Sequence, residues 1–513
     1  MCRLLRYTCV KEERDKKNND SVDKGLYDRI LKYTGMFGGV QGLVALVTIV
    51  RTKIVARLLG TVGFGLSESF NRTLNFVRST TDLGIPFSAV RTISSGYENK
   101  DEVVLAENVL LTRSWSFFTA VAGAVLCVIL APLFSLWAFD GDRGYTLSFI
   151  LLSPVVAFTT ITGGEMAVLK GLRKLREIAS AQLISVILTL FISVPLFCFM
   201  GLRGLVPSLV LVSLMVMIVT CRYSFRTSPY RIALLRKDML RKGTEMVRLG
   251  VFFTIASFLG SGTFTVIANY LMNHGGAETV GAYSAGYALV NYLAMFLFSA
   301  MDSEYFPRLS SSVSDCTSIS SQMNKQMEMS LLLAAPMVAA FVTFLEPAVR
   351  ILLTDKFFVA VPMTRIAVMS LLFKAMTQPA AYVSLAKGDS RTYLVQESLY
   401  DVFLAVAVVL GFEHGGLEYV GLAITLAGVF DLLMVFAIVR IRYSVGPDAG
   451  MLRGLLPVLL PVVAVYASVT FLDGYCKWLC ASAALAVSSL MSWRELEKRT
   501  SFISKLKGRF HLK

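Results

Sequence analysis

The chain has 513 residues, of which 55% are hydrophobic and only 17% are charged. This composition excludes an ordinary soluble domain, in which about a quarter of the residues are charged. The formal net charge is +15, and in a membrane protein such a surplus indicates basic cytoplasmic loops and contact with anionic lipid, not nucleic-acid binding. We therefore expect an all-α polytopic membrane protein.

The start of the chain is polar. About 30 residues, including the run "KEERDKKNND", precede the first apolar segment, and they lack the pattern of a cleaved signal peptide. The chain has eight scattered cysteines and three histidines, and no phosphate-loop motif occurs in it. We expect a cytoplasmic N-terminal tail, no disulfide framework, no metal site, no ATP hydrolysis and no catalytic residue.

Fourteen windows of the chain are long and apolar enough to cross a membrane as helices. A bilayer core needs about 20 apolar residues per helix. The windows are 33–52, 64–90, 114–137, 146–168, 178–200, 204–221, 249–271, 281–306, 328–353, 359–386, 394–412, 417–439, 454–472 and 475–493.

The strongest division of the chain is the segment 222–248, which carries eight Arg or Lys residues. If both termini are cytoplasmic, most basic residues lie in cytoplasmic loops and tails, and this asymmetry fixes the orientation. We expect a tail (1–32), an N-lobe with spans 1–6 (33–222), a basic linker (223–248), a C-lobe with spans 7–12 (249–442), spans 13 and 14 (453–493) and a basic tail (494–513).

An internal repeat relates the two lobes. The offset is 217 to 218 residues throughout: "TVG" at 61–63 returns at 279–281, Arg91 returns as Arg308, and "KG" at 170–171 returns at 387–388. Each lobe then contains an even number of helices, so both lobes lie the same way up around an axis along the membrane normal. This arrangement is typical of transporters, in which two matched lobes rock around a cavity.

Intramembrane charge gathers on the first two spans. At 100° per residue, Lys53 and Arg57 fall in one arc with several glycines, while Arg51 points elsewhere. Span 2 carries a polar stripe with Arg78 at its flank and an apolar face of Leu66, Phe70, Leu74 and Val77 opposite. A charge at the bilayer centre costs about 3 kcal/mol or more, so the stripe should not face lipid. The stripe consists of Glu68, Arg72, Asn75, Ser79, Asp82 and Pro86.

Two explanations of this charge remain open. Glu68 and Arg72 can pair at i,i+4 and hold the N-lobe together. The second lobe, however, has Gly, Val, Leu, Leu and Ala at the positions that correspond to the five polar residues 68–82, so the scaffold itself does not need them. Spans 1 and 2 also carry five basic against two acidic side chains, a surplus that indicates an anionic ligand.

The second lobe has an intramembrane set of its own. It consists of Lys374 in span 10, Glu397 and Asp401 at i,i+4 in span 11, and Asp431 in span 12. The carboxylates can carry H⁺ or Na⁺ during transport, and Lys374 can equally form a structural ion pair with one of them. Charged residues near span ends, including Glu165, Glu304 and Glu346, are expected to extend to water.

Residues 55–94, "VARLLGTVGFGLSESFNRTLNFVRSTTDLGIPFSAVRTIS", resemble the polysaccharide flippases of the Wzx type, within the multidrug/oligosaccharidyl-lipid/polysaccharide exporter superfamily. The number of spans, the two lobes and the basic middle segment agree with that family. The resemblance implies a V-shaped transporter of the bacterial inner membrane that flips an undecaprenyl-diphosphate-linked oligosaccharide for O-antigen, capsule or exopolysaccharide assembly, with the polysaccharide polymerase machinery as a further partner.

The resemblance also assigns roles to the charged side chains. A basic cavity surface would attract the diphosphate and would consist of Arg51, Lys53, Arg57, Arg72, Arg78 and Lys374. Polar cavity or ion-coupling positions would be Glu68, Asn75, Asp82, Glu397, Asp401 and Asp431. A cation-coupled multidrug exporter and a lipid II flippase, both of the same superfamily, remain alternatives. Spans 13 and 14 resemble the extra helices that form a lipid-tail groove in relatives of the lipid II flippase.

Overall fold

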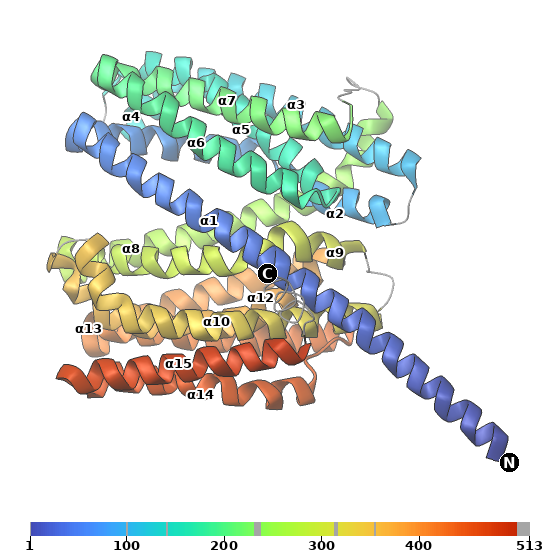
Figure 1. Ribbon diagram of the computed structural model, residues 1–513. Coiled ribbons are helices and arrows are strands. Elements are labelled where there is room, and N and C mark those ends of the chain that lie inside the picture. Colours follow the sequence, from blue (N-terminus) through green and yellow to red (C-terminus); the bar gives the residue numbers. More distant parts are fainter. Residues whose placement is uncertain are drawn as a thin grey trace, which may run out of the picture.

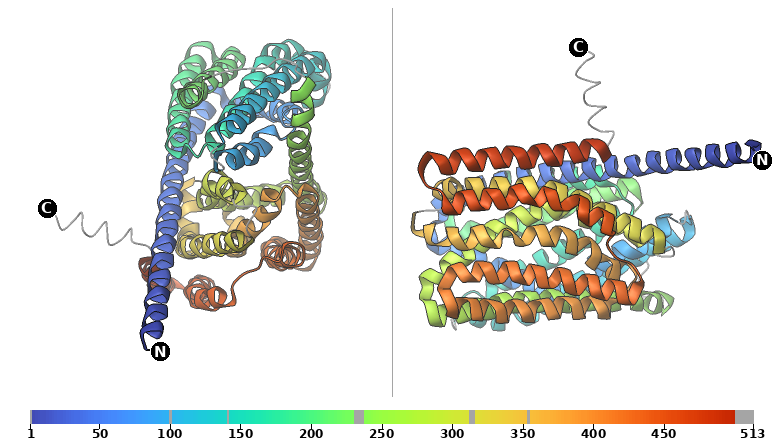
Figure 2. Two further views of the ribbon diagram at one scale, coloured as in Figure 1. Left: turned by 90° about the vertical axis from the view of Figure 1, so that its right-hand side faces the viewer. Right: turned by 90° about the horizontal axis from the view of Figure 1, so that it is seen from below.

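The computed structural model describes the chain except for Met1, 99–100, 140–141, 230–236, 312–315, 353–354 and 500–513. Among the described residues all regular secondary structure is helical. The helices lie in two stacked groups (Figures 1 and 2). The first helical group comprises α2 to α7 with the membrane part of α1, and the second helical group comprises α8 to α15. An all-helical polytopic fold is thus confirmed.

α1 (Cys2–Thr81) begins the chain and reverses direction within its length. Phe37 of α1 packs with Leu169, and Ile93, which follows α1, packs directly against Gly171. A straight helix would separate Phe37 from the end of α1 by about 66 Å, at 1.5 Å per residue. Because both ends approach the same part of the chain, α1 must turn back between them, as the first two expected spans require.

The first helical group is built around α5, which contacts α2, α3 and α7, while α6 packs on α1 and α7. Pro195 lies inside α6, and Gly201 (φ 55°) ends that helix before the chain turns into α7. The elements after α1 are α2 (Ile85–Glu98), α3 (Glu102–Ile129), α4 (Ala131–Ala138), α5 (Thr146–Gly171), α6 (Leu175–Met200), the 3-10 turn η1 (Gly201–Gly204) and α7 (Leu205–Thr227).

The second helical group contains two long helical segments that are bent at glycine. The kink in α8 lies at Gly276 (φ 77°), and the kink in α13 lies at Gly415 and Gly416. The elements are α8 (Lys237–Ala300), the π-helical turn η2 (Met301–Tyr305), α9 (Phe306–Ser311), α10 (Cys316–Leu352), the 3-10 turn η3 (Asp355–Val359), α11 (Ala360–Ala367), α12 (Ser370–Ala386), α13 (Ser390–Tyr443), α14 (Ala449–Phe471) and α15 (Gly474–Arg499).

Among the described residues, eight helices are long and apolar enough to cross a membrane, or nine if the pair of α11 and α12, bent by 49°, forms one span. This number is lower than the fourteen expected windows. One reason is that two of the eight segments, Leu175–Thr227 and Ser390–Tyr443, each contain two expected windows on either side of a glycine turn. Large apolar side chains such as Phe199 and Ile441 are exposed on the outside, as lipid contact requires.

The break between α1 and α2 recurs in the second helical group. Leu83 and Gly84 interrupt the first pair of helices with positive φ angles of 51° and 63°. Adding the repeat offset of 218 to residue 83 gives 301, and η2 begins at Met301, between α8 and α9. The two breaks lie at equivalent positions of the repeat, which supports the internal duplication inferred from the sequence.

The two helical groups meet along α2, which contacts α8 and α9. The ring of Phe87 stacks on Phe253 at 4.0 Å between centroids and on Phe306 at 4.7 Å. Gly84 and Gly250 touch backbone to backbone, since a Cβ at Gly84 would lie 2.1 Å from the Gly250 carbonyl oxygen. We call this contact between the groups the seam.

Candidate functional site

The polar and apolar faces predicted for span 2 lie as expected on the last part of α1. Phe70, Leu74 and Val77 are buried in one hydrophobic cluster, with Leu66 packed against it. Arg72 and Asn75, on the other face, are exposed. The helix thus presents its apolar side to the first helical group and its polar side away from it.

The structure describes four of the six basic side chains predicted to bind diphosphate. Arg51 donates a hydrogen bond from Nε to Ser193 Oγ of α6 (3.1 Å), so it turns into the first helical group. Arg78 is half-buried, and Lys374 lies in the second helical group. The side chains of Lys53 and Arg57, and that of Glu68 among the polar positions, lie outside the described part of the structure.

Asp82 is buried at the end of α1 and has a local partner. Its Oδ1 accepts a hydrogen bond from the backbone N–H of Gly84 (3.0 Å). The acceptor stabilises the tight turn at Leu83 and Gly84, where both φ angles are positive. Asp82 therefore shapes the break that brings Gly84 onto the seam, whatever further role it has in the cavity.

A row of hydroxyl groups on α8 was missed in the sequence. Ser257, Ser261 and Thr265 are exposed, and each donates to the backbone carbonyl four residues earlier. The row begins next to Phe258, whose ring contacts Phe76 of α1 at 5.8 Å between centroids. The spacing of four along one helix could have identified this face, but only the contact between the helices brings it beside the polar stripe of α1.

The predicted second-lobe set lies largely in one cavity of about 360 Å³. Lys374 from α12 and Glu397 and Asp431 from α13 all line it. Glu397 interacts electrostatically with Lys374 and with Asp431, and it is hydrogen-bonded to Tyr393. The spacing along the chain had placed these residues on three different expected spans, and the fold unites them.

Asp401 lies beside this cavity and does not line it. The residue is 7% exposed, and its Oδ2 has no hydrogen-bond partner among the described residues. A Cβ placed on Gly260 of α8 would lie 3.7 Å from that oxygen. Asp401 therefore faces α8 through a gap that the glycine leaves.

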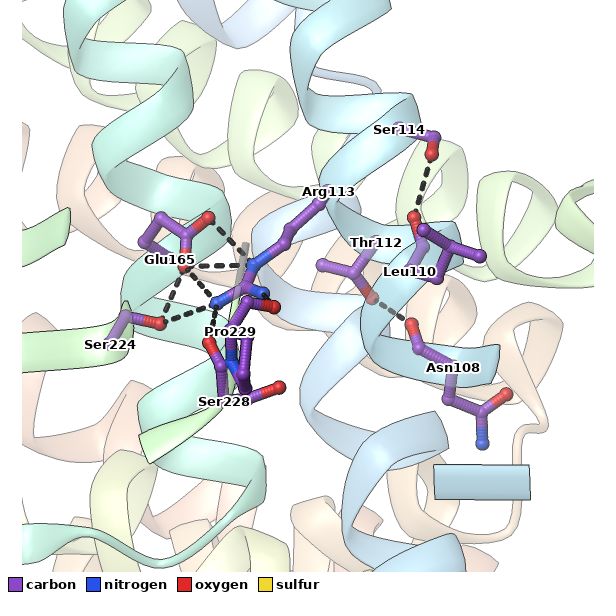
Figure 3. A network of polar contacts seen from close by, with 9 residues as sticks. All are labelled: Asn108, Leu110, Thr112, Arg113, Ser114, Glu165, Ser224, Ser228 and Pro229. Atoms are coloured by element: carbon purple, nitrogen blue, oxygen red, sulfur yellow. Dashed lines mark hydrogen bonds and ion pairs between the residues drawn. The ribbon is translucent and has the colours of Figure 1, made fainter. Parts of the chain in front are cut away.

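An ion pair in the first helical group, shown in Figure 3, was not predicted. Arg113 of α3 contacts Glu165 of α5, with Nε 2.9 Å from Oε1 and side-chain exposures of 1% and 2%. Arg113 also donates to Ser224 Oγ and to the carbonyl oxygens of Ser228 and Pro229. The expectation that Glu165 extends to water was wrong, because the neighbouring helices cover it.

Glu304 and Glu346 also have partners inside the second helical group. Glu304 is buried and contacts Arg308 at 3.0 Å, again in contrast to the expected extension to water. Glu346 of α10 binds Arg365 of α11 at 2.6 Å and Lys477 of α15 at 2.7 Å. The contact with Lys477 fastens α15 to the helices of the repeat.

Two arginines cross between the helical groups near the seam. Arg91 of α2 donates from Nε to the carbonyl oxygen of Ala386 at the end of α12 (2.8 Å). Arg173, in the turn after α5, donates to Ser311 Oγ of α9 (2.6 Å). Both arginines lie at the end of the molecule where the basic linker 223–248 joins the first helical group to the second. We call this end the linker end. The groups are held together there by charged donors.

Comparison with known proteins agrees with this architecture. The profile of a family described as "Polysaccharide biosynthesis protein" matches residues 54–362. No curated protein sequence matches the chain.

Solved structures with the same fold are transporters. An outward-facing conformation of a multidrug resistance MATE family transporter of the MOP superfamily has a TM-score of 0.66 at 13% identity, over 80% of this chain and 96% of the other. A MOP superfamily transporter from Pyrococcus furiosus with a binding pocket of reversed polarity gives 0.67 at 11% identity, with the same coverage. A MATE structure in the straight conformation gives 0.68 at 13% identity, over 83% and 98%.

Proposed function

Since the chain belongs to the polysaccharide biosynthesis protein family, we propose that it flips an undecaprenyl-diphosphate-linked oligosaccharide across the bacterial inner membrane. The glycan would serve O-antigen, capsule or exopolysaccharide assembly. The observation that carries the proposal is the family match over 54–362, together with a fold like that of MOP transporters. The role is transport and requires no catalytic residue.

The proposed topology has fourteen crossings. The N-lobe would span 33–222 and the C-lobe 249–442, joined by the basic linker 223–248, with two further helices at 453–493 and with tails at 1–32 and 494–513 on the cytoplasmic side. The glycine kinks within α8 and α13 support two crossings in each segment. The linker end would then face the cytoplasm, where its basic residues are favoured.

The contacts of the seam suggest how the cycle works. Arg91, Arg173 and the pair Gly84 and Gly250 join the helical groups at the linker end. If that end is cytoplasmic, the conformation is closed to the cytoplasm, and transport requires these contacts to break and to form again as the lobes rock. The two lobes would thereby expose the cargo to each side of the membrane in turn.

The diphosphate would bind on the polar side of spans 1 and 2. Arg72 is exposed on the face of α1 that points away from the first helical group, and the spacing of Lys53 and Arg57 places them on one arc of span 1. Hydrogen bonds from charged donors to phosphate oxygens are strong where water is partly excluded. The sugar chain would remain in the aqueous cavity, and the lipid tail would remain in the bilayer.

The carboxylates of the second helical group keep one alternative open. Glu397, Asp431 and Asp401 are the kind of groups that a cation-coupled exporter needs for H⁺ or Na⁺. An exporter of cationic drugs would, however, meet the basic side chains of spans 1 and 2. A lipid II flippase fits the charge as well, and its cargo would differ only in the sugar.

Neutralising the basic surface tests the proposal. We expect the double variant Lys53→Gln/Arg57→Gln to insert normally and to lose surface polysaccharide when it replaces the natural protein. Arg203→Gln, which removes an exposed charge from η1, is the matched control. Normal polysaccharide in the double variant would show that these two residues do not carry the cargo.

A further inference from the structure

The cavity that contains Lys374, Glu397 and Asp431 is lined by residues of both helical groups. Phe87 of α2 and Lys170 of α5 line it from the first group, and Phe253 of α8, Phe306 of α9 and residues of α12 and α13 complete it. Because the stacked ring of Phe87 belongs to the seam, the cavity loses a wall when the seam opens and regains it when the seam closes. Its volume of about 360 Å³ lies at the small end of ligand pockets, which hold about 300 to 1,000 Å³.

Two amide side chains in this cavity lack the hydrogen bonds that burial demands. Gln396 is 2% exposed, and among the described residues neither its Nε2 nor its Oε1 has a partner. Gln378 likewise has an unpartnered Oε1, while its Nε2 donates to the hydroxyl of Tyr382 (3.3 Å). A buried amide without partners is unfavourable, and a ligand with both donors and acceptors would supply the missing hydrogen bonds.

Charge and shape narrow the chemistry of that ligand. Two cationic side chains, Lys170 and Lys374, and two carboxylates, Glu397 and Asp431, line the cavity. The balance favours an uncharged ligand over a phosphate or a metal ion. Aromatic rings form one wall, with Phe253 stacked on Tyr393 at 6.1 Å between centroids. The C–H face of a sugar ring packs well on such rings, and its hydroxyls both donate and accept.

We propose that this cavity binds one neutral sugar unit of the transported glycan, with Gln396 and Gln378 bonded to its hydroxyls and the aromatic wall against its ring face. The inference rests on the proposed function and assigns to the second lobe a part in cargo recognition. It predicts that this cavity selects the sugar, while the basic surface of spans 1 and 2 binds the diphosphate.

The test measures binding of single sugars to the purified full-length protein. We would use saturation-transfer NMR in phospholipid nanodiscs, because detergents with sugar head groups would compete. D-Glucose, D-galactose and N-acetyl-D-glucosamine are the probes. Each is measured with the natural protein and with Phe87→Ala, which removes the ring that the first helical group contributes and so gives access in a closed conformation.

We expect at least one of these sugars to bind. Gln396→Met should weaken the affinity for that sugar about tenfold, which is the effect of losing one to two hydrogen bonds. Gln182→Met is the matched control, because Gln182 Oε1 of α6 also lacks a described partner but lies outside the cavity. The proposal is overturned if no sugar binds to the natural protein or to Phe87→Ala, or if Gln396→Met and Gln182→Met weaken sugar binding equally.

A separate readout distinguishes this failure from failure of the proposed function. If deletion of the gene leads to accumulation of lipid-linked glycans but no sugar binds to the protein, only the cavity assignment is wrong. If a sugar binds with the expected dependence on Gln396 while the lipid-linked pools remain unchanged on deletion, flipping is wrong.

Discussion

Arg113 and Glu165 form an ion pair in the interior of the first helical group, 52 positions apart in the chain and 2.9 Å apart in space. The pair joins α3 to α5, and Ser224 and the carbonyl oxygens after α7 complete its hydrogen bonds. The net contribution of a buried ion pair to stability is small, because desolvation offsets the attraction between the charges. Removing one partner is nevertheless strongly destabilising, because the other charge stays buried without compensation. Its effect should therefore be seen most clearly in single variants.

We predict that Arg113→Met lowers the free energy of unfolding by about 3 to 5 kcal/mol, because it leaves Glu165 charged and buried. The double variant Arg113→Met/Glu165→Met should recover much of that loss. Thermal unfolding in detergent measures both. Lys498→Gln is the matched control, since Lys498 is 70% exposed where it pairs with Glu495 and such a surface pair contributes about 1 kcal/mol or less. Equal losses in Arg113→Met and Lys498→Gln would contradict the buried role.

The close contact of Gly84 with Gly250 predicts that Gly84→Ala opens the linker end. The new methyl group would overlap the Gly250 carbonyl, and Gly84 also has a positive φ angle that alanine rarely adopts. Spin labels at Tyr97 and Arg391, both exposed at this end, report the distance between the helical groups in a cysteine-free background. We expect a longer distance and reduced transport.

Gly281→Ala serves as the control for that experiment, because nothing lies within 4 Å of its Cβ position. It should leave the distance between the labels unchanged. A Gly84→Ala protein with the natural distance and natural transport would show that the tight seam is not needed.

Asp389, in the turn between α12 and α13, predicts a dependence of stability on pH. Burial raises the pKa of its carboxyl, but hydrogen bonds from Arg442, Thr392 and Tyr443 outweigh burial and leave the pKa below its ordinary value. A depressed pKa stabilises the fold above the unfolded-state pKa, about 3.9, and that contribution is lost as pH falls through the folded-state value.

Asp389→Asn should therefore lower the unfolding temperature at pH 7, and the difference from the natural protein should shrink below about pH 4. Thermal unfolding from pH 7 down to pH 3 measures this difference. A difference that stays constant over the whole range would contradict the assignment.

The sequence predicted features that depend on helical periodicity. The buried face of Phe70, Leu74 and Val77 and the opposite exposed face of Arg72 are confirmed, because 100° per residue suffices to place them. The helical fold followed from composition in the same way. Two of the eight helical segments that the structure identifies as long and apolar enough to cross a membrane contain two of the expected spans each, on either side of a glycine turn.

Features that depend on contacts between distant segments were not predictable. Glu165 lies near the end of an expected span, where extension to water is the usual outcome, and only its packing beside Arg113 shows that it is buried. Lys374, Glu397 and Asp431 were singled out by their charge in apolar helices. Gln396 carries no charge, so its unpartnered amide becomes evident only when α2 and α8 enclose the cavity.

The central claim is tested most directly by mass spectrometry of undecaprenyl-diphosphate-linked glycans in membranes of cells with and without the gene, with surface polysaccharide measured in the same cells. The account predicts that deletion leads to accumulation of a completed lipid-linked oligosaccharide and loss of the surface polymer, and that the natural protein restores both. Unchanged lipid-linked pools together with normal surface polymer would contradict it, and sensitivity to cationic drugs would then decide for the exporter.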